Sequence, residues 1–502
     1  MSGPGLLVRA GLGLLLLTAA LGTPADADLW GHVTFGRDIV TSGHVIQADQ
    51  YSFTSDRAWV NHEWLSEVAM AEAYRAAGPA GLVGLKVAVI AALFLVLWRH
   101  IARLRPPAPL TIALLVLAFM GTFWRTHTVR PQLFSVLFFA LLLHAMVRFD
   151  EGRRTRIFVA PLLMALWVNV HGGWIVGLAV LGLWTAFRIL DRRGDLAPAD
   201  RVTLAIVGLL TVAATLANPY GTELWRFLAE TVRLGRDDIE EWGSILTHPV
   251  ALGLPWLLML SAVAAAFWRL PRMRRLDSLT IVGVLALVSF RVSRLDAFFA
   301  LAVVMLLTPA LVSALEPFVP RSRLTGTVGK GPASAWGAVV ITVVAVGAML
   351  VPAAPLIARY ASCLPIDGPW VPEPDAARFI ALNRLTGRMV TWFDWGEYAI
   401  WHFAPALRVS IDGRRETVYR DETIQAHRRF YAADDTALPY LRSLNPDYIW
   451  VPKRVPIATR LADTGWTMVF SGPMSAIFAR AGAGPFQQVA GVTTGVRCFP
   501  GP

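Results

Sequence analysis

Long apolar runs, broken by short polar connectors, occupy the chain from residue 6 to residue 353. An apolar run of about 20 residues is long enough to cross a bilayer as a helix, and shorter runs cross where helix or bilayer adapts. The runs lie near residues 6–23, 80–98, 108–123, 132–147, 157–170, 173–187, 202–217, 250–268, 278–290, 296–314 and 335–353. The pattern therefore predicts a polytopic α-helical membrane protein with about eleven transmembrane helices, several of them tilted or broken.

Two longer polar segments stand apart from these runs, a loop at 24–79 and a tail at 354–502. Alternating apolar and polar residues in the tail predict short strands, and amphipathic stretches predict helices. The strands are expected near 388–393, 407–411 and 447–451, and the helices near 374–385, 422–432 and 455–463. We expect a transmembrane domain over 1–353, which includes the loop 24–79, and a mixed α/β domain over 354–502.

The composition indicates the class of protein, and the positions of the charged residues predict the membrane topology. With 55% apolar residues and a mean hydropathy of +0.52, the chain is not a soluble globular protein. Its net charge of +11 comes from short arginine clusters after every second span, as membrane topology requires, and not from a stripe that would bind nucleic acid. This bias predicts a cytoplasmic N-terminus, with the loop 24–79 and the tail outside. The first run also resembles a signal peptide, but the spans alternate correctly only when it is retained.

The outer loop 24–79 begins directly at the end of the first span and is rich in acids and histidines. Its candidate groups are Asp26, Asp28, His32, Asp49, His62 and Glu63. A carboxylate at the edge of the apolar membrane core has a raised pKa and is sheltered from water, which suits a general base. The alternative interpretation is a set of helix caps and hydrated loop acids.

Four arginines lie in outer connectors, against the positive-inside rule: Arg125, Arg130, Arg291 and Arg294. A phosphate is one explanation, because the guanidinium group binds it through two parallel hydrogen bonds. The alternative is pairing with acids of the connector at 218–249, such as Glu241, or with lipid headgroups. His171, in a turn with two glycines, is a further candidate for substrate contact or for a structural role.

Both cysteines, Cys363 and Cys498, fall in the tail, so they are expected to form a disulfide if the tail faces an oxidising compartment. The sequence has no Cys or His cluster with metal-ligand spacing, no glycine-rich phosphate loop and no nucleophile elbow. No cofactor is therefore expected, and a divalent cation is not supported by the residues present.

The order of several motifs resembles a known family. The string Trp-Phe-Asp-Trp-Gly at 392–396 is similar to the Trp-Trp-Asp-Tyr-Gly signature of oligosaccharyltransferase catalytic subunits, with Phe393 and Trp395 as departures. With the acidic motif after the first span, it resembles the C-type glycosyltransferase superfamily (GT-C). Bacterial polytopic glycosyltransferases share motifs like those at 28–32, 61–65, 130–132, 169–173, 218–221 and 411–414. This similarity covers nearly the whole chain.

The resemblance implies transfer of a sugar from a polyprenyl-phosphate donor to a lipid, glycan or protein acceptor, at the outer face of a bacterial inner membrane. Asp28 matches the catalytic acid, Asp49 and Glu63 would support it, and Arg125, Arg130, Arg291 and Arg294 would bind the donor phosphate. His32, His62, His171, Asp394, Asp412 and Arg414 would contact substrates. Oligosaccharyltransferases hold a metal with a second acidic motif, and the loop 125–132 has no acid. The resemblance therefore implies a metal-independent transferase with a periplasmic tail and no nucleic-acid partner.

Two other functions stay open at this point. A polymerase or ligase of surface polysaccharide would also be polytopic with outward arginines, but it would depend on arginine and histidine without a loop aspartate such as Asp28. A transporter or accessory protein would show ionisable residues in mid-span or inverted repeats. The sequence has few ionisable residues in its span centres and no visible internal repeat.

Overall fold

A computed structural model describes residues 22–190, 196–231, 239–269, 276–318, 362–366, 368–461, 464–489 and 495–502, together with isolated residues at 11–17 and 355–359. The chain divides into two compact units. The helical unit comprises Met1–Gly22, Val83–Gly221 and Gly235–Ala361. The mixed unit comprises Thr23–Leu82, Thr222–Leu234 and Ser362–Pro502. The segment 24–79, which we expected within the transmembrane domain, thus clusters with the tail.

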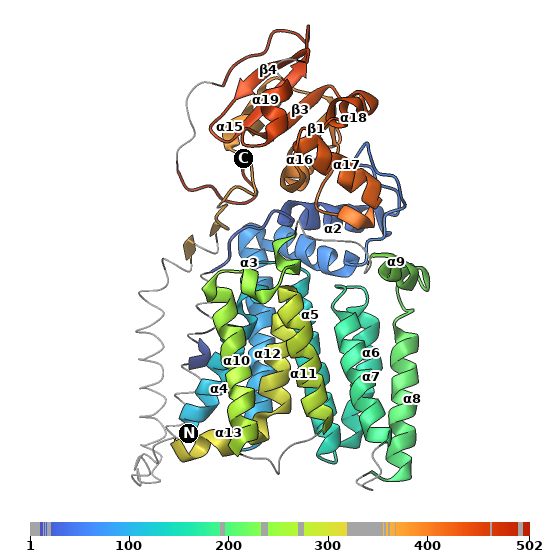
Figure 1. Ribbon diagram of the computed structural model, residues 1–502, viewed down its shortest axis with the longest axis vertical. Coiled ribbons are helices and arrows are strands. Elements are labelled where there is room, and N and C mark those ends of the chain that lie inside the picture. The colour runs from blue at the N-terminus through green and yellow to red at the C-terminus, as the bar shows by residue number, and fades with distance from the viewer. Residues whose placement is uncertain are drawn as a thin grey trace. The chain divides into compact units, whose positions relative to one another are not determined.

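The helical unit is a bundle of apolar helices (Figure 1). Its helices are α4 (Ala108–Thr126), α5 (Gln132–Asp150), α6 (Val159–Trp167), α7 (Trp174–Leu190), α8 (Pro198–Ala214), α10 (Val250–Arg269), α11 (Leu276–Arg291), α12 (Asp296–Leu306) and α13 (Thr308–Leu315). Helix α12 packs against α4, α5, α10 and α11, and its side chains are almost all buried. Gly121 of α4 permits close approach, because a Cβ atom there would stand 2.4 Å from that of Ala300.

Three described helices are long and apolar enough to cross a membrane: α3 (Trp64–Ala102), α4 and α5. A fourth candidate is the pair Ser293–Leu306 and Thr308–Leu315, which is bent by 67°. Helix α3 is itself broken, since Ala77 and Gly78 leave helical geometry just before Pro79. The expected spans at 6–23 and 335–353 lie largely or wholly outside the described residues. Large apolar side chains such as Leu209 and Trp268 are exposed, as lipid-facing residues are.

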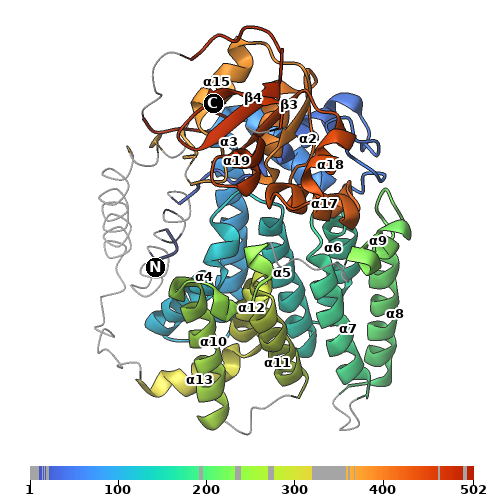
Figure 2. The same ribbon diagram turned by 45° about the horizontal axis from the view of Figure 1, so that its top comes forward.

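The mixed unit is built on a five-stranded sheet in the order β2-β1-β3-β5-β4. Its strands are β1 (Gly387–Thr391), β2 (Leu407–Val409), β3 (Tyr448–Pro452), β4 (Trp466–Ser471) and β5 (Ser475–Arg480). Strands β2, β1 and β3 are parallel, and β5 runs antiparallel to β3 and β4. Its tail helices are α15 (Pro374–Leu382), α16 (Gly396–Phe403), α17 (Asp421–Tyr431), α18 (Ala437–Leu444) and α19 (Pro456–Arg460). Helix α15 lies against β4 and β5 (Figure 2). The predicted mixed α/β character of the tail is confirmed.

The loop 24–79 belongs to this unit through both a helix and a strand-like segment. Helix α2 (Leu29–Ser42) packs against α16. The backbone of Tyr51–Phe53 runs along β2, where the Val409 N–H donates to Tyr51 O at 3.1 Å and the Phe53 N–H donates to Val409 O at 3.0 Å. The short helix α9 (Glu223–Thr231) also belongs here, with Phe227 beside His62. Chain segments far apart in sequence therefore form one hydrophobic and polar core.

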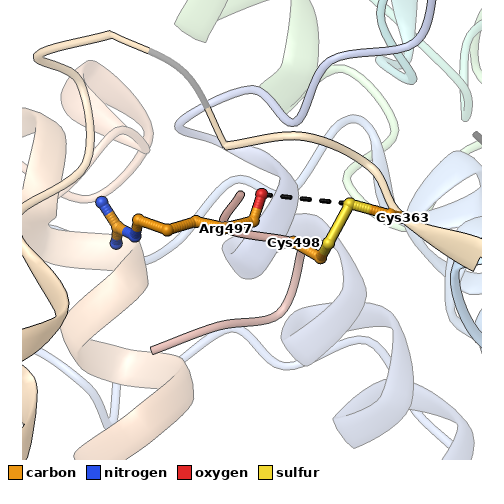
Figure 3. Close-up of a disulfide and its surroundings, with 3 residues drawn as sticks. All are labelled: Cys363, Arg497 and Cys498. Carbon is orange, nitrogen blue, oxygen red and sulfur yellow. Dashed lines mark hydrogen bonds between the residues drawn. A yellow bond between two sulfur atoms is a disulfide. The ribbon is translucent and has the colours of Figure 1, made fainter. Parts of the chain in front are cut away.

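A disulfide joins Cys363 to Cys498 across 135 residues of sequence (Figure 3). The two Cα atoms are 4.9 Å apart. The backbone pairs on either side of the bond, since the Ile366 N–H donates to Arg497 O and the Phe499 N–H donates to Leu364 O, both at 2.9 Å. The bond therefore anchors the end of the chain to the beginning of the tail.

Candidate functional site: a buried carboxylate cluster

Asp28 lies immediately before α2, at the position where a helix cap would be expected. Its side chain makes no capping hydrogen bond to that helix. Its own backbone N–H donates to Asp26 Oδ1 at 3.1 Å, so Asp26 shapes the turn that leads into α2. The first turn of α2 contains no acidic residue. The alternative interpretation of Asp28 as a simple helix cap is therefore not supported by its geometry.

Glu397, at the start of α16, is the acid that lies beside Asp28. It is 4% exposed. A Cβ atom on Gly413 would stand 2.6 Å from Asp28 Oδ1 and 2.8 Å from Glu397 Oε1, so these two oxygens flank one position. Burial raises the pKa of Glu397 well above its usual value, and the negative charges of Asp28 and Asp412 raise it further. The half-buried Asp28 and the buried Glu397, from different chain segments, thus border the same position.

Glycines make the room for this pair. A Cβ atom on Gly31 of α2 would stand 2.1 Å from Glu397 Oε2, and one on Gly396 would stand 2.3 Å from Ile411 O. Because real Cβ atoms do not approach so closely, only glycine permits α2 and the 411–413 turn to close around the Glu397 carboxyl group. This explains the glycines of the motifs at 28–32, 392–396 and 411–414 in physical terms.

Arg414 ties the cluster together from the other side. Its Nε and Nη2 donate to the Oδ1 and Oδ2 of Asp412 at 2.8 and 2.6 Å, and its Nη1 donates to Asp49 Oδ1 at 2.6 Å. The guanidinium carbon lies 4.7 Å from the ring centroid of Trp59, and the rings of Phe35 and Tyr51 also lie against it. The carboxylates of Asp412 and Asp49 raise the pKa of Arg414 although burial opposes this. These contacts make Arg414 and Asp412 an internal anchor.

His32, one turn after Asp28 on α2, is held by a second buried acid. His32 Nδ1 lies 3.3 Å from Glu67 Oε1, and Asn61 Nδ2 donates to Glu67 Oε2 at 2.5 Å. Burial alone would lower the pKa of His32, but the hydrogen bond to Glu67 and the charges of Glu67, Glu63 and Asp28 outweigh it and raise that pKa. The acids around His32 therefore favour its protonated form.

The other expected residues of this unit lie around the same cluster. Asp49 Oδ1 also accepts from the backbone N–H of Tyr51 at 3.0 Å, so Asp49 stabilises the loop. His62 Nε2 lies 3.7 Å from Glu63 Oε1, directly before α3. Asp394 Oδ2 accepts from Trp392 Nε1 at 3.0 Å. Burial raises the pKa of Asp394 to about 6, with a further contribution from Asp28, although the Trp392 hydrogen bond opposes it.

The helical unit contains an arginine cluster, which we define as Arg125, Arg130 and Arg294 around Glu241. Their Nη1 atoms lie 3.0, 3.6 and 3.7 Å from Glu241 carboxylate oxygens. Burial opposes ionisation of Glu241, but the three guanidinium charges outweigh it and lower its pKa to about 2. Arg125 Nε also donates to Asp296 Oδ1 at 2.9 Å. The alternative of pairing with Glu241 is thus realised for three of the four arginines.

Arg291 and His171 differ from this pattern. Arg291, exposed at the end of α11, makes no ion pair with the described part of the chain. His171 Nδ1 accepts from Gly173 N–H at 3.0 Å and from Ser135 Oγ at 2.8 Å, while Trp167 Nε1 donates to the same hydroxyl at 2.7 Å. His171 is buried and holds the turn between α6 and α7. Within the described residues, no group of three or more His, Cys, Asp or Glu side chains has the arrangement of a metal site.

Sequence reasoning missed two acids of the carboxylate cluster, Glu397 and Glu67. Glu397 directly follows the Trp-Phe-Asp-Trp-Gly string, and Glu67 follows Glu63 by one helical turn. An acid next to a glycine-containing motif, and an acid in the first turn of a mostly apolar helix, are weak signals. Glu397 and Glu67 can be recognised as candidate site residues only once the structure shows that their side chains are buried.

Comparison with solved structures identifies the fold. The apo oligosaccharyltransferase of Archaeoglobus fulgidus superposes with a TM-score of 0.61 at 11% identity, covering 89% of this chain and 69% of that chain. ArnT of Cupriavidus metallidurans bound to undecaprenyl phosphate superposes with a TM-score of 0.52 at 14% identity, covering 95% of this chain and 98% of that chain. Both are GT-C membrane glycosyltransferases.

The chain has the GT-C fold. This confirms the resemblance and the membrane class inferred from the sequence. No family model matches the chain, and no curated protein sequence matches it. At 11 to 14% identity, the GT-C likeness is a likeness of fold. What this chain does must therefore be argued from its own residues.

Proposed function

We propose that this protein is a membrane glycosyltransferase that moves a sugar from a polyprenyl-phosphate donor to an acceptor at the outer face of a bacterial inner membrane. The observation that carries the proposal is the buried carboxylate cluster around Asp28 on a GT-C fold. A half-buried acid that makes no capping bond to the helix behind it is suited to act as a base.

The reaction assigns a task to each cluster. Asp28 accepts the proton of the acceptor's hydroxyl or amino group as that group attacks the anomeric carbon of the sugar. The bond between this carbon and the donor phosphate breaks, and its electron pair stays on the phosphate. The arginine cluster and Arg291 bind the phosphate, whose charge grows as the bond breaks, so fixed cations stabilise the transition state more than the ground state.

The remaining candidates have supporting tasks in this proposal. Glu63 and Asp49 support the acidic site, the first beside His62 and the second through Arg414. His32, His62, His171, Asp394, Asp412 and Arg414 were expected to contact substrates. Because Asp412, Arg414 and His171 are buried in internal bonds, we assign them to shaping the site, and we assign direct contact to Asp394, His32 and His62.

The solved relatives support a lipid-phosphate donor and a separate acceptor. One ArnT structure contains undecaprenyl phosphate, and one A. fulgidus oligosaccharyltransferase structure contains a tethered acceptor peptide. For this chain we propose the same two kinds of partner, with the acceptor a lipid, a glycan or a protein. The same proposal includes a cytoplasmic N-terminus, about eleven spans and a periplasmic mixed unit, as the arginine clusters predict.

The test is transfer from a synthetic polyprenyl-phosphate sugar by purified protein, comparing Asp28→Asn with the wild type. Asn keeps the shape and hydrogen bonding of Asp but cannot accept the proton. We expect a loss of about two to four orders of magnitude in turnover with folding and donor binding kept.

Glu72→Gln is the matched control, since Glu72 is an exposed acid on the same unit that pairs with Arg75. Its activity should equal that of the wild type. Activity of folded Asp28→Asn within a few-fold of the wild type would remove Asp28 from the proposal. It would also favour a polymerase or ligase that relies on the outer arginines alone.

A further inference from the structure

One oxygen of the buried Glu397 carboxyl group has no hydrogen-bond partner in the part of the chain that the structure describes. Glu397 Oε2 is buried and receives no hydrogen bond from the described residues. A carboxylate anion in such a place would lose its hydration without compensation. The neutral acid carries a hydrogen on one oxygen and tolerates burial far better. The protonation state of Glu397 is therefore a question that the geometry itself raises.

The groups that face Glu397 are mostly negative. Asp28 lies before α2, Asp412 follows β2, and Glu67 lies on α3, while Arg414 is the one positive group among those that act on it most strongly. Arg414 is already committed, because its three nitrogens donate to Asp412 and Asp49. No ion pair between Arg414 and Glu397 occurs within the described chain. A proton on Glu397 itself would lower the cost of burying its carboxyl group.

Asp28 is the neighbouring group that a proton on Glu397 would affect. The Asp28 Oδ1 and Glu397 Oε1 atoms lie 2.6 and 2.8 Å from the Cβ position of Gly413, and the missing side chains of Gly31, Gly396 and Gly413 leave room for both carboxyl groups. Two carboxylates that border one small space disfavour each other's ionisation, and they titrate as a pair. The arrangement resembles other acid pairs in which one member stays neutral and the other stays charged.

We propose that Asp28 and Glu397 form a dyad that holds one proton in the resting protein, with Glu397 as the neutral member and Asp28 as the anion. Glu397 is then a positioning residue, which points its carboxyl hydrogen toward Asp28 and keeps Asp28 ionised. When the acceptor gives its proton to Asp28, the dyad holds two protons, and one is released to water as the product leaves. The effect of the dyad on catalysis rests on the proposed function. The number of protons that the dyad holds in the resting protein does not.

The proton count can be measured without any substrate. Infrared spectroscopy of the purified protein should show a carboxylic-acid C=O band at neutral pH that is absent in Glu397→Gln and unchanged in the exposed control Glu72→Gln. In Asp28→Asn the same band should titrate at lower pH, because the neighbouring negative charge is gone. A spectrum in which Glu397→Gln removes no acid band, or in which Asp28→Asn leaves its titration unchanged, would overturn the dyad. The second variant retains Glu397, so the test stands even if Glu397→Gln folds poorly.

Activity then tests what the dyad does. Since Gln mimics a neutral Glu, Glu397→Gln should keep turnover at neutral pH within several-fold, while Glu397→Ala should lose about tenfold or more. The wild type should lose activity at alkaline pH as the dyad gives up its proton, and Glu397→Gln should lack this alkaline loss. A purely structural Glu397 would leave the shape of the pH profile unchanged. Full activity of Asp28→Asn alongside a normal titration shift would reject the proposed function and keep the dyad.

Discussion

Arg414 and Asp49 are separated by 365 residues, yet Arg414 Nη1 donates to Asp49 Oδ1 at 2.6 Å inside a box of aromatic rings. The bond links the loop 24–79 to the tail within one compact unit. It also explains why an arginine lies in an apolar place, since both carboxylate partners and the ring of Trp59 replace the water that it loses.

Loss of Arg414 should therefore destabilise the mixed unit. We expect Arg414→Ala to lower the free energy of unfolding by about 3–5 kcal/mol, because Asp49 and Asp412 would stay buried without a counter-charge. The midpoint of thermal unfolding of the purified protein measures this. Arg75→Ala, an exposed arginine paired with Glu72, is the control and should change the midpoint little. A normal midpoint for Arg414→Ala would contradict the anchor.

Removal of Glu241 should free the arginine cluster for an anion. We expect Glu241→Gln to bind polyprenyl phosphate about tenfold more tightly, since the carboxylate that neutralises Arg130 and Arg294 is gone. Arg130→Ala and Arg294→Ala should each weaken binding by a similar factor. Binding of a fluorescent polyprenyl phosphate measures both effects, and Arg75→Ala is the control. Unchanged binding in all three variants would place the phosphate elsewhere.

The disulfide should contribute to stability and report the compartment. Cys363→Ser with Cys498→Ser should lower the free energy of unfolding by about 2–4 kcal/mol, because a loop closed over 135 residues would be released. Mass mapping without reductant should recover one peptide pair joining the two cysteines. Free thiols at both positions, in protein prepared without reductant, would contradict the oxidising compartment.

Asp394 should make stability depend on pH with a definite sign. Its pKa rises from 3.8 to about 6 on folding, mainly through burial, so the folded protein holds its proton where the unfolded chain has lost it. Asp394 therefore favours the folded state most below its unfolded pKa, and stability falls as pH rises from 3.8 to about 6. Asp394→Asn should remove this part of the pH dependence in thermal unfolding measured from pH 4 to 7. An identical pH dependence in the variant would show that Asp394 is not responsible.

The sequence alone predicted the membrane class, the mixed α/β tail and the GT-C resemblance. These properties depend on local patterns: apolar runs of membrane length, alternation in the tail, and motifs that recur in order. The helices expected at 374–385 and 422–432 correspond to α15 and α17, so hydrophobic periodicity predicted the positions of these two helices. The role of Asp28 and the topology stay predictions, because no described contact tests them.

Only the tertiary structure decided which residues meet. The proximity of Glu397 to Asp28 depends on close approach at Gly31 and Gly413. The ion pair between Arg130 and Glu241 joins two connectors that lie far apart in the sequence. The attachment of the loop 24–79 to the tail was equally invisible, because it depends on backbone pairing along β2 and on the Arg414 box. Periodicity records which face of a segment is buried, whereas long-range partners are set by packing and by the need to compensate buried charge.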